Sequence, residues 1–366
     1  MTSEDYAAVA LSRVPSVGAQ LYRNLIDHFG DAAAALRATP RELLRVRGVA
    51  RKTAAHFAAE GHYREADAVA QFADRHPLRI FHVGQETYPA SLRGFPTAPA
   101  VLYYYGTADL DNPYRLAVVG SRNMSAAGHR QIERLLDPLV QHGVLIVSGL
   151  AYGVDIAAHR RALQQGLPTL AVLGSGFEHI YPHQHHRVAR KMAEQGGGLL
   201  SEYPPWQRPE RLHFPARNRI VAMLAEMTVV VQSGTTGGSL ITANMAREFG
   251  RVVGACPGES GNPYTAGCNM LIKEGRAVLV EEARDISRTL NWDAPGVTAP
   301  QLPLLDDLDE EALRIVRTLK QGERSMDELR HAGAFAGPEL AAALLTLELR
   351  GLVLSLPGRR YRLQYG

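Results

Sequence analysis

Four segments of this chain combine glycine with serine, threonine or arginine where an apolar run ends and an amphipathic run begins. Backbone N–H groups at such strand-to-helix turns can bind an anion, and the helix dipole favours negative charge there. Hydroxyl groups add donors, and an arginine adds a planar fork that suits phosphate. The pattern therefore predicts a site for a phosphorylated ligand. The four segments are VVGSR (118–122), VSGLAYGVD (147–155), VLGSGFE (172–178) and VVQSGTTGGSL (230–240).

The elements that carry these segments alternate between short apolar strands and amphipathic helices. Such alternation predicts an α/β fold with a Rossmann-like, mostly parallel sheet covered on both faces. The carboxyl ends of parallel strands share one edge, where ligands bind. We expect helices at 126–142, with a kink at Pro138, and at 156–165. The expected strands are 101–106, as an added strand, and 116–119, 145–147, 169–173, 199–201, 228–231, 251–255 and 277–280.

Residues 1–80 contain two similar turns between short helical runs, Val14–Gly18 and Val46–Ala50. An apolar residue, a tight turn and a helix start are typical of a helix-hairpin-helix or SAM-like domain. Such turns can present N–H groups to a DNA phosphate. A helical scaffold or interaction domain is the alternative, and we favour it.

After this first domain, the sequence predicts a Rossmann-like domain at 81–290, a proline-marked linker at 291–304 and a winged helix at 305–366. The third helix of a winged helix commonly reads DNA and is then basic. Here it is PELAAALLTLELR, which favours a protein-interaction or accessory role. The expected elements of this last domain are helices at 309–320, 325–331 and 338–350 and a hairpin of 352–356 with 360–363.

Charge and composition narrow the class of partner. The chain has 366 residues with 40 Lys or Arg against 37 Asp or Glu, a net charge of +3. A polyanion would therefore have to be bound in a pocket or groove with concentrated positive charge. No apolar run approaches about 18 residues, and the N-terminus lacks a signal-peptide pattern, so we expect a cytoplasmic protein without a membrane span. The two cysteines cannot form a structural zinc site alone.

Arginines are the strongest individual candidates for anion binding. Arg122 follows a buried strand, and Arg217 and Arg219 flank Asn218 in the acid-free run FPARNRI. Crowded cations repel one another, which suggests an anionic partner; a solvated basic face is the alternative. Asp155 could cap a helix, orient a loop or bond a sugar or base edge. As a lone carboxylate it is weak support for hydrolysis or metal binding.

Two clusters invite a catalytic or metal interpretation that we do not adopt. His179, His183, His185 and His186 surround a Tyr-Pro pair, but no acidic or sulfur ligand joins them. We expect them to be solvent-facing helix histidines. Neither a Rossmann GxGxxG nor a P-loop is present in the first glycine segment. We therefore predict no catalytic residue, no metal site and no cofactor.

Taken in order, GSR, SGLAYGVD-IAAH, VLGSG, YP, LLSEYP, FPARNR, GTTGGSLITA and ACPG resemble the DNA-processing protein A family (DprA, also called Smf). The resemblance covers about residues 88–280, and the flanking domains match the longer architecture of that family. It implies a non-enzymatic mediator that binds and protects single-stranded DNA and loads the RecA recombinase in natural transformation or recombination. A homodimer through the Rossmann-like domain is implied, and single-strand-binding protein is a further expected partner.

The resemblance also implies a DNA pocket around the arginine of GSR. This sequence differs from its relatives at two positions that concern the pocket. Relatives often have a lysine soon after YP, where this chain has His183, and a glutamate where it has Gln232. The alternatives are a nucleotide-cleaving phosphoribohydrolase-like enzyme and a scaffold that acts only through protein contacts. The DNA-binding candidates are Gly120, Ser121, Arg122, Ser148, Gly149, Asp155, Gly174, Arg217, Asn218, Arg219, Gly237, Gly238 and Ser239.

Overall fold

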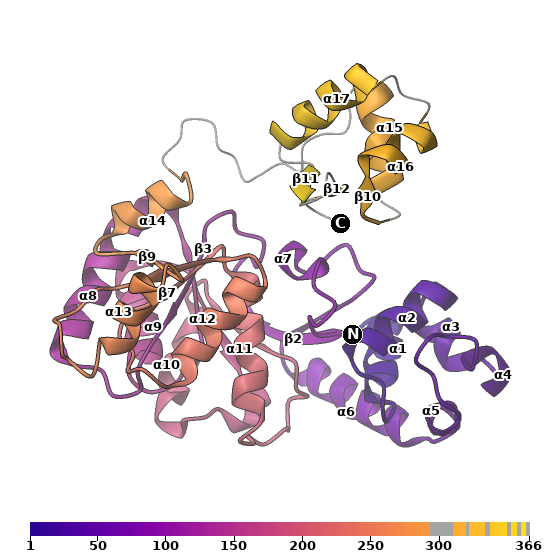
Figure 1. The fold of residues 1–366 in the computed structure, drawn as a ribbon. Coiled ribbons are helices and arrows are strands. Elements are labelled where there is room, and N and C mark those ends of the chain that lie inside the picture. The colour runs from indigo at the N-terminus through magenta and orange to yellow at the C-terminus, as the bar shows by residue number, and fades with distance from the viewer. Residues whose placement is uncertain (293–309, 320–321, 334–336, 350–352, 357–359, 364–366) are drawn as a thin grey trace. The chain divides into compact units, whose positions relative to one another are not determined.

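The computed structural model separates into two compact units, Met1–Ala294 and Pro295–Gly366. Figure 1 shows the helices and strands of each unit. None of the helices in the described residues is long and apolar enough to cross a membrane. The structure describes residues 1–292, 310–319, 322–333, 337–349, 353–356 and 360–363.

A nine-stranded sheet organises the first unit, in the order β1-β2-β6-β5-β4-β3-β7-β8-β9. The strands from β6 to β9 in this order pair in parallel, whereas β2 pairs antiparallel with both β1 and β6. The predicted parallel core and the added strand are confirmed. The strand β1 was not predicted. The bounds are β1 Leu78–His82, β2 Val101–Gly106, β3 Arg115–Val119, β4 Leu145–Ser148, β5 Thr169–Leu173, β6 Gly198–Ser201, β7 Met227–Val230, β8 Val252–Ala255 and β9 Val278–Leu279.

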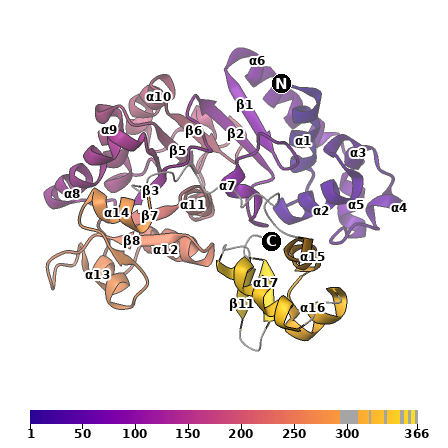
Figure 2. The ribbon, with the colours of Figure 1, turned by 90° about the horizontal axis from the view of Figure 1, so that it is seen from above.

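Helices cover both faces of this sheet, and side chains alternate along each strand to supply both cores. On β3, Ala117 and Val119 pack with α11 and α12, while Leu116 and Val118 pack with α8 and α9. Figure 2 shows these two helix pairs on opposite sides of the strands. The helix bounds are α7 Ala90–Arg93, α8 Ala126–Leu136, α9 Val154–Gln165, α10 His186–Glu194, α11 His213–Leu224, α12 Gly238–Glu248, α13 Ala266–Lys273 and α14 Ala283–Thr289, with 3-10 turns η1 Asp137–His142, η2 Phe177–His179 and η3 His183–His185.

The predicted kink at Pro138 is the point where α8 gives way to the 3-10 helix η1. Proline lacks the N–H that an α-helix would need there, and it is tolerated early in the tighter turn. The helix after the last glycine segment begins at Gly238, and the helix expected at 156–165 begins earlier, at Val154. Both glycine segments therefore lead directly into helix N-termini.

The N-terminal helices form their own core and also pack on the end of the sheet through Val101 and Tyr103. The two predicted turns are confirmed as helix–turn–helix connections. Ser16 and Gly48 occupy the same place in them, with φ of 74° and 93°. Because the left-handed region is costly for a residue with a Cβ, Ser16 marks a constrained turn. The helix bounds are α1 Ser3–Arg13, α2 Ala19–Phe29, α3 Ala32–Arg37, α4 Pro40–Leu43, α5 Arg51–His56 and α6 Gly61–Arg75.

The second unit has three helices and a three-stranded sheet of order β10-β12-β11, as expected for a winged helix. Ser325 and Glu328 form a capping box, since each side chain accepts the other residue's backbone N–H. The short strand β10 was not predicted. The bounds are α15 Glu310–Leu319, β10 Arg324–Ser325, α16 Met326–Gly333, α17 Gly337–Leu349, β11 Val353–Leu356 and β12 Arg360–Leu363.

Most of the predicted linker, 293–304, lies outside the described residues. Its second residue, Trp292, is 5% exposed and packs edge-on against Tyr114 with ring centroids 5.3 Å apart. The indole Nε1–H donates to a carboxylate oxygen of Glu226 at 3.2 Å. Burial raises the pKa of Glu226, and this donor and Arg115 oppose that rise. Trp292 therefore belongs to the packed first unit.

Candidate nucleic-acid interface

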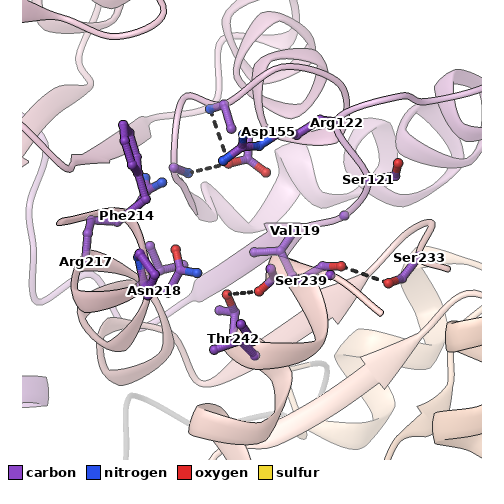
Figure 3. A pocket seen from close by; sticks show the side chains of 18 of the residues that line it. Val119, Ser121, Arg122, Asp155, Phe214, Arg217, Asn218, Ser233, Ser239 and Thr242 are labelled. Atoms are coloured by element: carbon purple, nitrogen blue, oxygen red, sulfur yellow. Dashed lines mark hydrogen bonds between the residues drawn. The ribbon is translucent and has the colours of Figure 1, made fainter. Parts of the chain in front are cut away.

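A cavity of about 700 Å³ lies at the carboxyl edge of the parallel strands. It collects the residues after β3, β4 and β7 with the N-terminal part of α11 (Figure 3). Strand β3 stands between β4, which follows it in sequence, and β7, which comes much later. Such a reversal of strand order opens a crevice in which parallel sheets bind ligands. The sequence-predicted residues that line it are Gly120, Ser121, Arg122, Gly149, Asp155, Arg217, Asn218, Gly237, Gly238 and Ser239.

The loop after β3 lies directly on the N-terminus of α9. The N–H of Val154 donates to the carbonyl of Ser121 at 3.1 Å. A Cβ on Gly153 would lie 2.1 Å from that carbonyl oxygen, and a Cβ on Gly120 would lie 2.5 Å from a methyl of Val154. Gly153 also has φ of 72°. Glycine at both positions therefore permits the close contact that places Arg122 at the cavity.

Gln232 connects this loop to β7. Its backbone carbonyl accepts the N–H of Ser121 at 2.7 Å. Its side-chain oxygen accepts the N–H of Ser125 at 3.0 Å, and its amide donates to the Ser125 hydroxyl at 2.8 Å. Ser125 in turn caps α8. An amide can make both side-chain bonds, whereas a glutamate carboxylate could not donate the second. The glutamine thus has a local structural role.

Arg217 is 4% exposed and lies against the loop after β4. A Cβ on Gly149 would lie 2.1 Å from Nη1 of Arg217. The same nitrogen donates to the carbonyl of Val172. Among the described residues, Nε of Arg217 has no hydrogen-bond partner although it is buried. A side chain at position 149 would therefore collide with Arg217. Glycine there allows the Arg217 guanidinium to line the cavity.

Asp155 lies beneath the same loop and orients it. Its carboxylate accepts the N–H of Gly149 at 3.2 Å and of Ala151 at 3.3 Å (Figure 3). Burial raises the pKa of Asp155, while Arg217 and the two amide donors oppose that rise. Of the roles weighed for this residue, loop orientation is the one that these bonds describe.

Arg122 and Arg217 both line the cavity, so two guanidinium groups belong to one lining. Burial lowers the pKa of Arg217, Asp155 opposes this, and the nearby positive charge of Arg122 lowers it further. Arg122 is exposed, and within the described part of the chain it forms no ion pair with a carboxylate. Since like charges repel, the arrangement gains free energy from an anion between or beside them.

The glycine-rich loop contributes a helix N-terminus on the opposite wall. Gly237 has φ of 147°, and α12 begins at the next residue. The hydroxyls of Ser233 and Ser239 lie 2.9 Å apart, and Thr242 donates to the carbonyl of Gly238 at 3.1 Å. The first N–H groups of a helix lack intrahelical acceptors, so this end of α12 is suited to a phosphate.

Three predicted residues do not line the cavity. Ser148 is fully buried and donates to the carbonyl of Val118 at 2.6 Å. A Cβ on Gly174 would lie 3.1 Å from the Phe214 ring, so this glycine serves helix packing. Arg219 is bound bidentately by Glu202 at 2.7 and 2.6 Å. Crowded cations suggested an anionic partner, and for Arg219 that partner is a carboxylate of the chain itself, supplied by Glu202 from outside the acid-free run.

The expectation that all four clustered histidines face solvent is wrong for His185. This residue is 4% exposed, and its Nδ1–H donates to the carbonyl of Leu150 at 2.7 Å. It supports the loop after β4, where Leu150 has φ of 59°. His183 is exposed and is not part of the cavity lining. No group of three or more His, Cys, Asp or Glu residues placed for a metal occurs among the described residues.

Aromatic and basic residues at the rim were not among the candidates. Tyr181, 47% exposed, lies 5.4 Å from Phe214 by ring centroids, and both line the cavity. Arg211 also lines it. The motifs YP and FPARNR contain the two rings, but their approach depends on the three-dimensional packing of α11. The cavity thus combines guanidinium groups, a helix N-terminus and exposed rings.

The contact between Gly153 and the β3 loop leads to a stability prediction. Gly153→Ala should lower the free energy of unfolding by at least about 2 kcal/mol, because a disallowed φ and a backbone clash add together. Gly166→Ala is the control, since Gly166 shares φ of 72° but a Cβ there would meet no atom within 4 Å; its cost should be about 1 kcal/mol. Equal losses in urea unfolding would contradict the role of the contact.

A buried histidine under the site leads to a second prediction. The Nδ1–H of His159 donates to the Thr169 hydroxyl at 2.7 Å, since that hydroxyl donates onward to Ile146. Burial, with the charges of Arg217 and His185, lowers the pKa of His159 from 6.5 to about 3. The unfolded chain therefore binds a proton that the folded chain excludes.

Stability from this residue is present above pH 6.5 and is lost as the pH falls toward 3. The free energy of unfolding should drop by up to about 1.4 kcal/mol per pH unit in that window. His159→Gln, which can donate but does not titrate, should flatten this slope. Urea unfolding of both proteins across the window measures the difference, and parallel curves would show that His159 is not kept neutral.

The chain resembles known proteins in both sequence and fold. The chain is 37% identical to protein Smf of Escherichia coli over 295 residues, 76% of each chain. It is 41% identical over 206 residues to DNA processing protein DprA of Streptococcus pneumoniae, covering 56% of this chain and 72% of that one. The X-ray structure of DprA from Streptococcus pneumoniae matches with a TM-score of 0.67 and 32% identity, over 79% of this chain and 98% of that chain.

The DNA processing protein A of Helicobacter pylori, solved for its single-stranded DNA binding mode, matches with a TM-score of 0.54 and 28% identity, over 60% and 97% of the two chains. Family models match all three parts of the chain: a DprA-like N-terminal HHH domain at 2–67, DNA recombination-mediator protein A at 79–291 and a DprA winged helix domain at 299–359. These matches show that the chain belongs to the DNA recombination-mediator protein A (DprA/Smf) family.

Proposed function

We propose that this chain binds single-stranded DNA in the sheet-edge cavity. The observation that carries the proposal is the presence of the exposed Arg122 and the buried Arg217 in one cavity lining, where a phosphate would reduce the repulsion between their charges. The N-terminus of α12 supplies N–H donors to a neighbouring phosphate. The relative from Helicobacter pylori, whose structure concerns single-stranded DNA binding, supports the same ligand.

The rim suits unpaired bases. Tyr181 and Phe214 offer ring faces at the cavity mouth, and Tyr181 is 47% exposed. Stacking on an aromatic ring contributes about 1–3 kcal/mol per base and needs little sequence preference. A duplex keeps its bases stacked inside, so rings placed this way favour single strands. Arg122 and Arg211 can follow the backbone beside them.

We further propose the biological role that membership of this family suggests. The bound strand is protected in the cytoplasm and passed to a RecA-type recombinase during transformation or recombination, with single-strand-binding protein as a further partner. In this role the protein binds DNA and catalyses no reaction on it. In support, Asp155 is the one carboxylate lining the cavity among the described residues, and it accepts the backbone N–H groups of Gly149 and Ala151. A nucleotide-cleaving site would need a carboxylate free to act on the sugar or base.

Arg122→Ala should weaken binding of a labelled oligo-dT by about tenfold or more, because a charge-assisted fork to phosphate is lost from an exposed residue. The melting temperature should stay near that of the wild type. Arg247→Ala is the control: it removes the same charge from the opposite end of α12 and should change affinity little. Fluorescence anisotropy over a salt series measures both. Wild-type affinity in Arg122→Ala would overturn the assignment, and release of free base from a nucleotide would favour an enzyme instead.

We propose a homodimer formed through the sheet edge at β9. Both residues of this edge strand are exposed and apolar, Val278 at 39% and Leu279 at 46%. An edge strand also has unpaired backbone N–H and C=O groups. A second subunit packed on this edge would bury the apolar side chains and pair those groups.

Leu279→Glu should convert the dimer to a monomer in light scattering, because a charge would be buried at the contact. Val140→Glu is the control, since Val140 is similarly exposed at 42% but lies on η1. A wild-type protein with the mass of a monomer, or a dimer that Leu279→Glu leaves intact, would contradict this surface.

A further inference from the structure

A second cavity, of about 450 Å³, adjoins the first on the side of α8 and α9. The two cavities share Arg122, which lines both. The backbone of this arginine lies against Gly153, where a Cβ would be 2.6 Å from the Arg122 carbonyl carbon. The second cavity is lined by Arg122, Asn123, Met124, His129, Ile132, Glu133, Gly153, Ile156, Ala157, Arg160, Arg161 and Gln164.

Helix α9 separates the two cavities and presents a different face to each. Asp155 lines the first cavity, whereas Ile156, Arg160 and Gln164 line the second. These three are spaced four residues apart and so share one side of the helix. The exposed Arg122 therefore lines two adjoining cavities and does not belong to one of them alone.

The second cavity has an apolar floor and a basic rim. Ile132 and Ile156 are buried, at 2% and 7% exposed, and Met124 is half-buried beside them. Arg160 is exposed, and no carboxylate pairs with it within the described part of the chain. This combination suits a nucleotide unit, with its phosphate on Arg160 and its sugar or base against Met124, the more exposed of the three apolar side chains.

The remaining charges leave Arg160 as the available cation beside Arg122 in this lining. Arg161 donates through Nε to Asp137 at 2.6 Å and lies 3.8 Å from Glu133, so its charge is already compensated. Glu133 is exposed and is the one carboxylate in this lining. Its negative charge opposes a phosphate there and gives a second, opposite test of the site.

We propose that the second cavity holds the continuation of the single strand after it passes Arg122, with Arg160 on a backbone phosphate. The inference rests on the proposed function. It goes beyond that function by extending the path of the strand across α9. A strand is favoured over a free nucleotide because Arg122 belongs to both cavities, so successive phosphates can be bound along one route.

The experiment compares a short and a long probe. Oligo-dT of about four nucleotides fits the first cavity, and oligo-dT of about sixteen can reach the second. Arg160→Ala should weaken the long probe by about three- to tenfold and lower its salt slope by about 0.7, while leaving the short probe within about twofold. Arg130→Ala removes the same charge from exposed α8 surface outside both linings and should affect neither probe.

Glu133→Gln should tighten the long probe by about twofold or more, because it removes the opposing charge. A gain of affinity cannot come from misfolding, so this variant keeps the proposal testable if Arg160→Ala is unstable. Equal loss on both probes, or long-probe affinity that neither variant changes, would overturn the second cavity as a DNA site. Wild-type protein that binds neither probe would instead overturn the proposed function itself.

Discussion

The site depends on how closely the loop after β3 lies on the N-terminus of α9. This contact exists because Gly120 and Gly153 have no Cβ and because Ser121 bonds on both sides, to Gln232 and to Val154. With the loop held there, Arg122 has one position from which its side chain reaches solvent. The same packing opens the hollows on both sides of α9. Backbone proximity, rather than any single side-chain bond, therefore sets the geometry of the cations.

Much of this arrangement could be predicted from the sequence because strand ends and glycine turns are local signals. The parallel strands, the glycine segments at their ends and Arg122 at the cavity follow from such signals. The strand Leu78–His82 did not, because its partner is an antiparallel strand and its buried face meets helices far away in sequence. Hydrophobic period alone does not reveal such a partner.

The surroundings of the other arginines could not be predicted from the sequence. Arg217 and Arg219 are two residues apart, yet one is buried against Gly149 and the other is paired with Glu202. On a helix, residues two apart point in different directions, so a run of cations does not act as one patch. His185 is a similar case, since its acceptor, the Leu150 carbonyl, comes from another loop. Each outcome depends on long-range packing.

Modest net charge and polyanion binding are compatible because the protein pairs its carboxylates locally. Asp155 accepts backbone amides, Glu202 holds Arg219, and Asp137 holds Arg161. Arg122 and Arg160, which line the hollows, have no such carboxylate partner among the described residues. Coulomb attraction acts strongly only within about a Debye length, so a strand responds to these local charges more than to the total of +3. On the proposed function, a flexible single strand can follow these arginines from the first cavity to the second, which a rigid duplex could not do.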